Sequence, residues 1–403
     1  MTYLRFGIHL LLILALNYWI LSFFFYRKLK RAVPHLEKLE LPLPPKPPLV
    51  SVIMPACNEA DHLELAVLSR LKSDYPNAEF ILVDDRSTDA TLQIVNRLAA
   101  QFPNLRIIRI SELPDGWLGK VHALQKGLEA ANGEWILFTD ADVYFSPDLL
   151  SRSMAYCLSR DKDHLALLPQ FLTSSLLLDT VISHFMRLLC LMGRLSKVEE
   201  PRSGAAVGAG AFSLFRRSAL ERTSGLEWLR LEVIDDIALG QMLKYNGARQ
   251  AVASGIGLLK VQFYPSLKAM ARGMEKNAFA AAGEFKPFRL IANVAALFIL
   301  EMSPFIAFLP CWHPLMRLAG AATLLISIIV SILVNKWMRQ TVYSAFLWPL
   351  GTIFMTLFTL RSGFLALRRG GIIWRGTLYP LALLRAHRRF SPRWRAEPNN
   401  RHS

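Results

Sequence analysis

The feature that most constrains the fold is a long apolar run near the N-terminus. Residues 6–25 are predominantly apolar, and about 20 such residues let a helix cross the hydrocarbon core of a bilayer. A cleaved signal peptide is the alternative, but the run is long for one, its basic residues follow it, and no small-residue cleavage site comes after it. We therefore predict a transmembrane anchor over residues 1–26. The positive-inside rule places the basic residues that follow on the cytoplasmic side.

Apolar stretches also dominate the C-terminal part of the chain. The hydrophobic content of 53% exceeds that of most soluble domains, so part of this surface is expected to face lipid. Glu301 and Pro304 interrupt the first stretch. We predict a C-terminal transmembrane region over residues 287–366, in a multi-pass protein of a bacterial-type inner membrane. The three stretches cover residues 290–309, 315–334 and 342–360.

The membrane topology of the C-terminal part stays open at this level. If residues 336–339 and the segment after the anchor are cytoplasmic, one more complete crossing places the basic tail, residues 367–403, outside. That placement conflicts with the positive-inside rule. Either one apolar segment is re-entrant or interfacial, or the tail is an exception. Residues 176–195 have helical apolar spacing with interspersed charges, which fits an interfacial helix or a helix packed on a domain core.

Charge and cysteine content narrow the function classes. The net charge of +16 comes from 47 Lys and Arg against 31 Asp and Glu, and the basic residues gather beside the apolar spans and in the tail. This pattern favours an anionic membrane surface, and no nucleic-acid module is recognisable, so we expect no nucleic-acid partner. The four cysteines form no C-x-x-C pair, which indicates neither a disulfide framework nor a zinc site. We interpret Cys57 as a small buried thiol.

An α/β domain is predicted between the anchor and the C-terminal region. Residues 27–48 form a basic, proline-rich linker, in which proline prevents regular structure over residues 41–48. From position 49, short apolar runs alternate with helical patterns, which predicts a mostly parallel sheet covered by helices on both faces. Such sheets bind ligands at the carboxyl ends of their strands. The predicted strands are residues 50–54, 80–83, 105–110 and 135–138, and the predicted helices lie near residues 60–71, 90–100 and 120–131.

Two carboxylates stand directly after the last of these strands. Asp140 and Asp142 are separated by one residue, so their side chains can converge on a divalent ion that also grips a diphosphate. Oxygen ligands of this kind suit Mg²⁺ or Mn²⁺. An acidic turn that caps the next helix is the alternative interpretation of this pair alone.

Three other polar patches are expected at the same edge of the sheet. An aspartate at a strand end can accept hydrogen bonds from a base or ribose, and a lysine at a helix start can meet a phosphate. Each patch also has a structural interpretation, as a helix start or as an N-cap within residues 87–89. The residues predicted to line a nucleotide site are Pro55, Asn58, Glu59, Asp84, Asp85, Lys120 and Asp140.

In their order along the chain, residues 50–89 and 116–142 resemble the nucleotide-binding half of family 2 glycosyltransferases, which have the GT-A fold. The resemblance extends over about residues 49–282. It implies a GT-A domain over residues 49–286, with a nucleotide-sugar half at 49–145 and an acceptor half at 146–286.

The resemblance also implies an activity and roles for individual residues. The family transfers a sugar from a nucleotide-sugar by a single displacement, with inversion at the anomeric carbon. Asp84 and Asp85 fall at the family's uridine-binding position, which favours a UDP-sugar over a GDP-sugar. Asp140 and Asp142 fall at the position that binds the diphosphate and a metal cofactor, Mn²⁺ or Mg²⁺.

An acidic pair further along the chain fits the acceptor side of such a reaction. A displacement needs a carboxylate that takes the proton of the acceptor hydroxyl. Asp235 and Asp236 resemble the family's acceptor-side acidic motif, with Asp236 as the base and Asp235 as its neighbour; Asp235 as a plain helix N-cap is the alternative. The small-residue segment 204–215, with Gly208 and Gly210, resembles the family's segment near the acceptor, where close backbone approach is useful.

Two departures bear on the acceptor. The Q-x-x-R-W motif of processive polysaccharide synthases is absent after Asp236, which argues against synthesis of cellulose, chitin or hyaluronan. Arg272, Lys276 and Asn277, together with a late W-R-G-x-x-Y segment at 374–379, are similar to the branch associated with hopanoid and carotenoid glycosylation. This resemblance implies a lipid acceptor at the cytoplasmic face of the membrane. The three residues are candidates for the acceptor region, and a solvated helix face is the alternative.

Two other functions are kept as alternatives. One is a glycosyltransferase that acts on a polyprenyl phosphate or on a short exopolysaccharide. The other, from a different class, is a catalytically silent membrane scaffold that keeps the fold. A silent protein is expected to have lost acidic motifs, whereas all three aspartate pairs, at positions 84 and 85, 140 and 142, and 235 and 236, are present.

Overall fold

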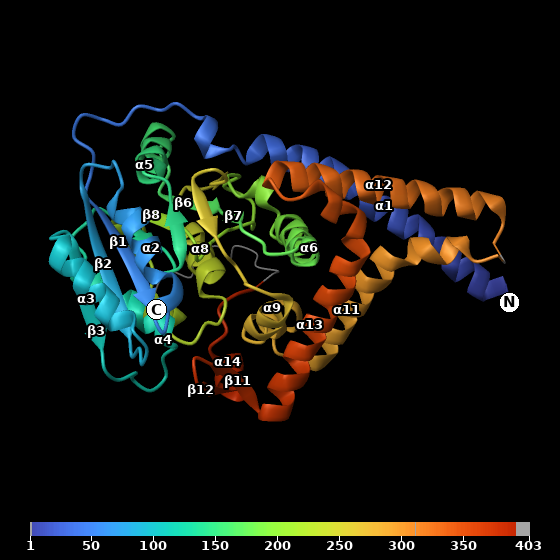
Figure 1. Cartoon of the computed structure of the whole chain (residues 1–403). Coiled ribbons are helices and arrows are strands. Elements are labelled where there is room, and N and C mark those ends of the chain that lie inside the picture. The colour runs from blue at the N-terminus through green and yellow to red at the C-terminus, as the bar shows by residue number, and fades with distance from the viewer. Residues whose placement is uncertain (1, 311, 392–403) are drawn as a thin grey trace. The chain divides into compact units, whose positions relative to one another are not determined.

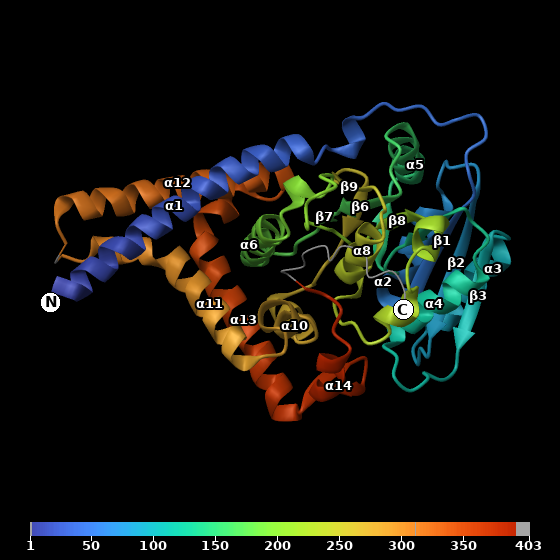
Figure 2. The same ribbon diagram turned by 180° about the vertical axis from the view of Figure 1, so that it is seen from behind.

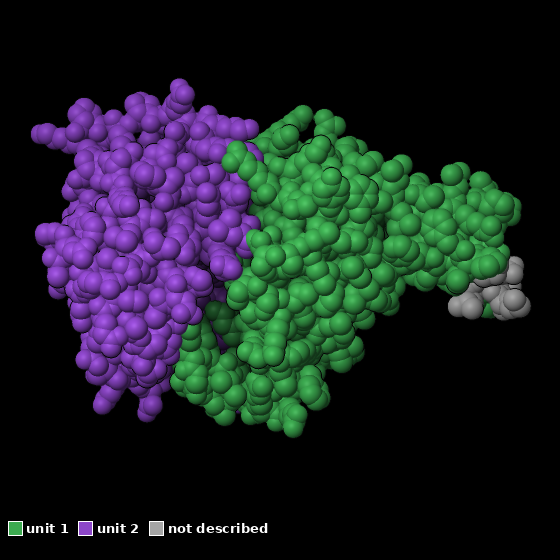
Figure 3. Space-filling view, viewed as in Figure 1, with its two compact units in different colours: residues 1–32, 173–196, 263–381 green, residues 33–172, 197–262, 382–403 purple. Residues whose placement is uncertain are grey.

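The computed structural model describes residues 2–310 and 312–391. Contacts divide the chain into two units, which Figure 3 draws in different colours. The chain passes between the units more than once, so neither unit is continuous in sequence. Unit 1 holds the N-terminal helix to Ala32, Thr173–Ser196 and Phe263–Leu381; unit 2 holds Val33–Leu172, Lys197–Gln262 and the segment from Ala382.

This division differs from the consecutive boundaries predicted from the sequence. Residues 173–196 and 263–286, predicted as parts of the acceptor half, belong to the helical unit 1. The segment from Ala382, predicted as part of a C-terminal tail, belongs to unit 2. The physical reason is that an apolar helix face is buried against partners close in space, and these partners can be far apart in sequence.

The sheet of unit 2 has seven strands in the order β3-β2-β1-β4-β8-β6-β9. Strand β1 lies between β2 and β4 and runs parallel to both, and β3 is parallel to β2. Strands β1, β2 and β4 are mostly buried apolar runs, as expected for parallel strands covered on both faces, whereas the edge strand β3 exposes Arg106 and Arg109. Their bounds are β1 Val50–Ala56, β2 Ala78–Asp85, β3 Leu105–Ile110 and β4 Trp135–Phe138.

The helices between these strands confirm the sequence prediction. They are α2 (Ala60–Leu71), α3 (Thr91–Gln101) and α4 (Gly119–Ala130), each within one residue of the predicted range. Both ribbon views show them beside strands β1, β2 and β3 (Figures 1 and 2). The first helix begins directly after the end of β1, so it starts at the carboxyl edge of the sheet.

The second half of the domain makes the sheet mixed. Strand β8 (Ser213–Arg216) is antiparallel to both β4 and β6, whereas β6 (His164–Leu168) and β9 (Gln250–Ser254) are parallel. The predicted mixed, mostly parallel sheet is therefore confirmed. Residues 41–48 form neither helix nor strand, as their prolines predict. The remaining elements are β5 Val143–Phe145, β7 Gln170–Phe171, β10 Leu259–Val261, α5 Leu149–Ser159, α7 Arg217–Glu221, α8 Asp235–Tyr245 and the 3-10 helices η1 Leu36–Lys38, η2 Leu195–Lys197 and η3 Leu226–Leu229.

Unit 1 is helical. Five of its helical segments are long and apolar enough to cross a membrane, which includes the anchor and the three C-terminal stretches predicted from the sequence. The fifth is residues 176–197, which belong to unit 1 except for Lys197. The elements are α1 Thr2–Ala32, α6 Leu176–Met192, α9 Leu267–Gly273, α10 Ala278–Gly283, α11 Pro287–Met302, η4 Ser303–Phe308, α12 Pro314–Met338, η5 Val342–Leu347, α13 Trp348–Arg369 and the hairpin β11 Gly371–Trp374 and β12 Thr377–Pro380. The last helix, α14 (Leu381–Ala386), belongs to unit 2 except for its first residue.

The structure explains why an apolar helix carries Glu301. This side chain is fully buried and makes an ion pair with Arg187 at 2.6 Å. Its two carboxylate oxygens also accept hydrogen bonds from the hydroxyls of Tyr18 and Thr352. One carboxylate thus connects α1, α6, α11 and α13, and a buried charge is tolerated when it is paired and hydrogen-bonded in this way.

Candidate active site

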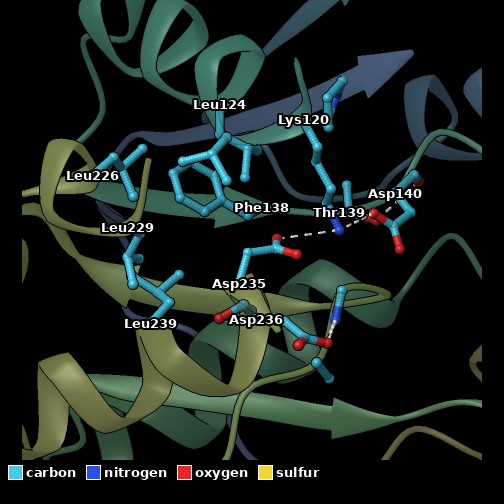
Figure 4. Close-up of a pocket in the computed structure, with 15 residues that line it drawn as sticks. Lys120, Leu124, Phe138, Thr139, Asp140, Leu226, Leu229, Asp235, Asp236 and Leu239 are labelled. Carbon is cyan, nitrogen blue, oxygen red and sulfur yellow. Dashed lines mark hydrogen bonds and ion pairs between the residues drawn. The ribbon is translucent and has the colours of Figure 1, made fainter. Parts of the chain in front are cut away.

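One pocket in unit 2 gathers three of the acidic residues singled out in the sequence, Asp140, Asp235 and Asp236 (Figure 4). Its polar end holds Lys120, Asp140, Asp235 and Asp236, and its other end is formed by aliphatic and aromatic side chains. The pocket lies where β1 and β4 end and where α4 and α8 begin, which is the expected carboxyl edge of the sheet. Its apolar lining comprises Val121, Leu124, Phe138, Leu226, Leu229 and Leu239.

Lys120 joins the two aspartate pairs across this pocket. Its Nζ atom lies 2.7 Å from Asp140 Oδ1 and 3.4 Å from Asp235 Oδ2. Burial by itself lowers the pKa of Lys120, but the attraction of Asp140, Asp235 and Asp236 outweighs it and raises the pKa above the usual range. Lys120 therefore carries its positive charge in this site.

Arg70, which no sequence motif singled out, supports the backbone of the D-x-D turn. Its guanidinium donates to the carbonyl oxygen of Ala141 at 3.1 Å and to that of Asp140. It is completely buried and lies 5.2 Å from the centre of the Phe145 ring. A sequence signal was available: Arg70 continues the helical spacing of the buried apolar residue Leu63 on α2, where a cation is unexpected.

Asp236 is held by backbone amides in the first turn of α8. Its Oδ2 atom accepts from the amide of Gly210 at 3.0 Å and its Oδ1 atom from the amide of Ile237 at 2.8 Å. Burial, followed by repulsion from Asp235, raises the pKa of Asp236 to about 6. The alternative of Asp235 as the N-cap is not what the structure shows, because α8 begins at Asp235 and its N-cap is Ile234.

Gly208 and Gly210 lie where the prediction placed the close backbone approach. A Cβ atom on Gly208 would fall 1.7 Å from the carbonyl oxygen of Asp236, and one on Gly210 would fall 2.6 Å from Asp140 Oδ2. Gly210 also accepts from the amide of Asp140 at 2.9 Å. The backbone of Gly210 therefore contacts both the D-x-D turn and Asp236.

A buried glutamine fixes the same segment from behind. The side-chain oxygen of Gln250 accepts from the amide of Val207, and its nitrogen donates to the carbonyl oxygens of Val207 and Gly240. The His164 ring lies 2.7 Å from the same nitrogen. These contacts hold the 207–210 segment against α8, and nothing in the local sequence around Gln250 predicts them.

The residues predicted for the nucleotide base form a second group at the ends of β1 and β2. Asn58 adopts a left-handed backbone conformation with φ of 55°, and its side-chain oxygen accepts from the amide of Thr88 at 2.8 Å. Asp85 forms an ion pair with Arg86 at 2.7 Å, and Asp84 is buried. Of the predicted nucleotide residues, Pro55, Lys120 and Asp140 line the pocket, whereas Asn58, Glu59, Asp84 and Asp85 do not.

The helix-start interpretations of this region are partly confirmed. Glu59 stands at the N-cap position of α2 but its side chain makes no cap hydrogen bond. Asp89 accepts from the amides of Thr91 and Ala60, and so joins the starts of α3 and α2. Within residues 87–89, Asp89 thus stabilises the starts of these two helices.

Three other residues predicted for the acceptor region, Arg272, Lys276 and Asn277, belong to unit 1. Arg272 lies on α9, and Asn277 is the N-cap residue of α10. The Nζ atom of Lys276 lies 4.3 Å from the centre of the Trp374 ring, so two motifs of the second resemblance are in contact within this unit. None of the three lines the pocket, and a role for them in acceptor binding stays a prediction.

The oxygen atoms of the D-x-D turn are of the kind that binds a divalent cation. Asp140 and Asp142 offer carboxylate oxygens, which hard cations prefer, and the Lys120 ammonium already places a positive charge beside Asp140. The pKa of Asp142 is raised, first by burial and then by the neighbouring Asp140 carboxylate. Within residues 2–310 and 312–391, no group of three or more His, Cys, Asp or Glu side chains is arranged to hold a metal.

Comparison with known proteins identifies the family of the domain that carries most of this pocket. Residues 51–223 match the family described as "Glycosyl transferase family 2". This stretch is a family 2 glycosyltransferase domain. It contains the D-x-D turn, Lys120 and the glycine segment, while Asp235 and Asp236 follow 12 and 13 positions after its end.

Curated relatives share the nucleotide-binding half. An uncharacterized glycosyltransferase of Haemophilus influenzae is 33% identical over 111 residues, which are 28% of this chain and 43% of that protein. A putative teichuronic acid biosynthesis glycosyltransferase of Bacillus subtilis is 34% identical over 113 residues, again 28% and 43%. The matches thus span under half the length of these relatives.

A solved structure resembles the chain over a greater length. A mannosyltransferase from Pyrobaculum calidifontis, in complex with GDP-Man and Mn²⁺, aligns with a TM-score of 0.55 at 20% identity. The alignment covers 88% of this chain and 99% of that one. This likeness shows the GT-A fold, which confirms the fold class predicted from the sequence.

Proposed function

We propose that this protein is a metal-dependent inverting glycosyltransferase that moves a sugar from a nucleotide-sugar to a lipid acceptor at the cytoplasmic face of a membrane. The observation that carries the proposal is the gathering of Lys120, Asp140 and the Asp235–Asp236 pair in one pocket of a family 2 domain. A UDP-sugar is favoured over a GDP-sugar by Asp84 and Asp85 at the end of β2, although the mannosyltransferase with a similar fold binds GDP-Man.

In the proposed reaction the acceptor hydroxyl attacks the anomeric carbon of the donor. Its proton passes to Asp236, a new C–O bond forms, and the bond to the nucleoside diphosphate breaks. Inversion follows because a single displacement occurs from the face opposite the leaving group. The raised pKa of Asp236 suits this role, because a base with a pKa near the working pH accepts a proton efficiently.

The leaving diphosphate needs positive charge. Lys120, at the start of α4, can turn from Asp140 towards a phosphate oxygen, and a helix start also favours anions. Asp140 and Asp142 would hold a Mn²⁺ or Mg²⁺ ion, which neutralises diphosphate charge when bound. The mannosyltransferase of similar fold contains Mn²⁺, which supports this assignment.

The lipid acceptor is supported by features of each unit. The pocket beside Asp236 has an apolar wall that includes Leu226, Leu229 and Leu239. The same chain carries five helical segments apolar enough to cross a membrane, with many apolar side chains on the outside of unit 1. One of them, α6, lies in sequence between β7 and β8, so the acceptor half is covalently tied to the helical unit on both sides.

The test is a transfer assay in detergent or nanodiscs. A panel of UDP- and GDP-sugars is supplied with membrane lipid extract, with Mn²⁺, Mg²⁺ or a chelator, and products are identified by mass spectrometry. The expected result is a metal-dependent mass gain of one sugar on a lipid, lost in Asp236→Asn and kept in Asp161→Asn, an exposed aspartate paired with Arg249.

Other outcomes separate the alternatives. Transfer to a polyprenyl phosphate or to a soluble saccharide, with none to other lipids, would replace the lipid acceptor by one of those two classes. A protein that binds neither metal nor nucleotide-sugar by calorimetry would support the catalytically silent scaffold.

A further inference from the structure

The last described residues of the chain are seated on the catalytic domain. After α14, residues 387–391 lie against the segment 226–241 of unit 2. The buried carboxylate of Glu232 anchors them: its Oε2 atom accepts from the amides of Arg389 at 2.5 Å and Phe390 at 2.8 Å. Its other oxygen accepts from the amide of Ile234 at 2.8 Å. One side chain thus holds the C-terminal segment and the residue before the catalytic aspartates.

The side chains of Gln241 and Arg389 make further contacts between the two segments. The side-chain amide of Gln241 donates to the carbonyl oxygen of Ser391 at 2.9 Å and accepts from its amide at 3.3 Å. The Arg389 guanidinium donates to the carbonyl oxygen of Trp228 at 3.1 Å and lies 4.9 Å from the centre of the Trp228 ring. Glu232 and Gln241 form hydrogen bonds mainly with the backbone of the C-terminal segment. Their contacts therefore depend on the backbone path of this segment.

The segment 226–241, which binds residues 387–391, also forms a wall of the pocket. Trp228, Glu232 and Gln241 bind the C-terminal residues, while residues between and beside them line the pocket. The carbonyl oxygen of Arg230 accepts from the amide of Leu118, two residues before Lys120. Much of the wall is irregular, since η3 covers only Leu226–Leu229 and α8 begins at Asp235. The pocket-lining members are Leu226, Leu229, Asp235, Asp236 and Leu239.

We propose that residues 387–391 brace the acceptor side of the active site, and that Glu232 is a positioning residue that couples this brace to Asp235 and Asp236. The proposal rests on the function proposed above. Without the brace, the buried Glu232 oxygen loses both of its amide donors, and a buried carboxylate without partners is costly. The 230–234 turn then relaxes and Asp236 loses its fixed place, whereas the metal-binding turn, which Arg70 supports separately, does not change.

The experiment compares two truncations and two matched substitutions in the full-length protein. Ending the chain after Ala386 removes the brace, whereas ending it after Ser391 keeps it. Glu232→Gln keeps the size of the side chain but replaces one acceptor oxygen by a donor group. Its control is Glu227→Gln, which changes an exposed residue of the same segment that does not bind residues 387–391. The readouts are kcat, the dissociation constant of the nucleotide-sugar with metal, and amide hydrogen exchange over residues 226–241.

If residues 387–391 brace the active site, their loss and the substitution Glu232→Gln should change kcat, donor binding and amide exchange in the same way. We expect kcat to fall by roughly ten- to a hundredfold, the effect of a small misplacement of a catalytic group, while the donor dissociation constant stays within about twofold. Amide exchange over 226–241 rises, and a synthetic peptide of residues 387–403 restores part of kcat in the chain that ends after Ala386. Glu227→Gln and the chain that ends after Ser391 match the wild type.

Failure of this proposal and of the transferase function can be told apart. If the wild type transfers no sugar to any acceptor, the proposed function fails, and hydrogen exchange alone decides the brace. Unchanged exchange over 226–241 after loss of residues 387–391 overturns it. Unchanged kcat in an active enzyme that has lost the segment overturns it equally, as does a loss of donor binding that parallels the loss of kcat.

Discussion

The two aspartate pairs at the carboxyl edge of the sheet are held by opposite means. Asp140 follows a strand and its side chain is 40% exposed, while its backbone and that of Ala141 are fixed from below by Arg70. Asp235 is only 10% exposed, and Asp236 is fixed through its carboxylate by the amides of Gly210 and Ile237. In the first pair the backbone is held, and the partly exposed Asp140 carboxylate is paired only with the mobile side chain of Lys120 among the contacts described above; in the second pair the Asp236 carboxylate is held by backbone amides.

This difference assigns different chemistry to the same amino acid. Partly exposed carboxylate oxygens on a fixed backbone suit a metal or a phosphate-bound cation. A carboxylate that is immobilised and partly desolvated suits proton transfer, because its pKa is raised towards neutrality and its direction is fixed. The predictions below test whether the two pairs can be separated in this way.

The largest effect is expected from Asp236→Asn. Removal of the proposed base should lower kcat by roughly 10²- to 10⁴-fold, while the nucleotide-sugar dissociation constant stays near that of the wild type, because the amide oxygen can still accept from Gly210. Steady-state kinetics and calorimetry measure the two quantities. A loss of donor binding as large as the loss of kcat would show that Asp236 serves the donor instead.

Asp142→Asn should affect the other half of the site. An amide is a poorer ligand for a hard cation, so we expect metal affinity to fall by at least ten- to a hundredfold, the loss caused even by removing an outer partner of a metal ligand. Mn²⁺ binding followed by electron paramagnetic resonance gives the affinity. Asp161→Asn is the control, and a variant with unchanged Mn²⁺ binding would remove Asp142 from the metal site.

Arg70→Met tests whether the backbone of the first pair needs its support. Two carbonyl oxygens lose a buried donor, which costs about 1–3 kcal/mol for each group left unsatisfied. We expect roughly tenfold weaker Mn²⁺ binding in protein that remains folded, with the pH dependence of turnover unchanged. Arg97→Met, which removes an exposed guanidinium paired with Glu64, is the control. A shifted pH profile in Arg70→Met would mean that the two pairs are not independent.

The smallest effect concerns pH. Asp236 acts as a base only when deprotonated, and its pKa is raised to about 6. The value of kcat/KM for the acceptor should therefore be constant above pH 7 and fall about tenfold per unit below pH 6. Asp235, Lys120 and Asp140 are the charged groups that face Asp236. A profile that stays flat down to pH 5 would contradict the assignment of the base.

The fold of the nucleotide-binding half could be predicted because its signals are local. Buried parallel strands are continuous apolar runs, and amphipathic helices between them repeat every three or four residues, so α2, α3, α4, β3 and β4 were located to within one residue. The D-x-D pair and Lys120 followed from the rule that strand ends meet at one edge of the sheet. The boundaries of the two units did not follow, because α6 and the C-terminal residues pack against parts of the chain that are remote in sequence.

The sequence by itself determined the strands and helices of the nucleotide-binding half, the apolar segments and the acidic residues that follow the strands, since periodicity and composition encode them locally. Only the tertiary structure decided that Arg70 lies under the D-x-D turn, that Gly210 donates to Asp236, and that Glu232 holds the C-terminal segment. Each of these is a contact between segments distant in the chain. Such contacts are set by how buried polar groups find partners when the elements pack.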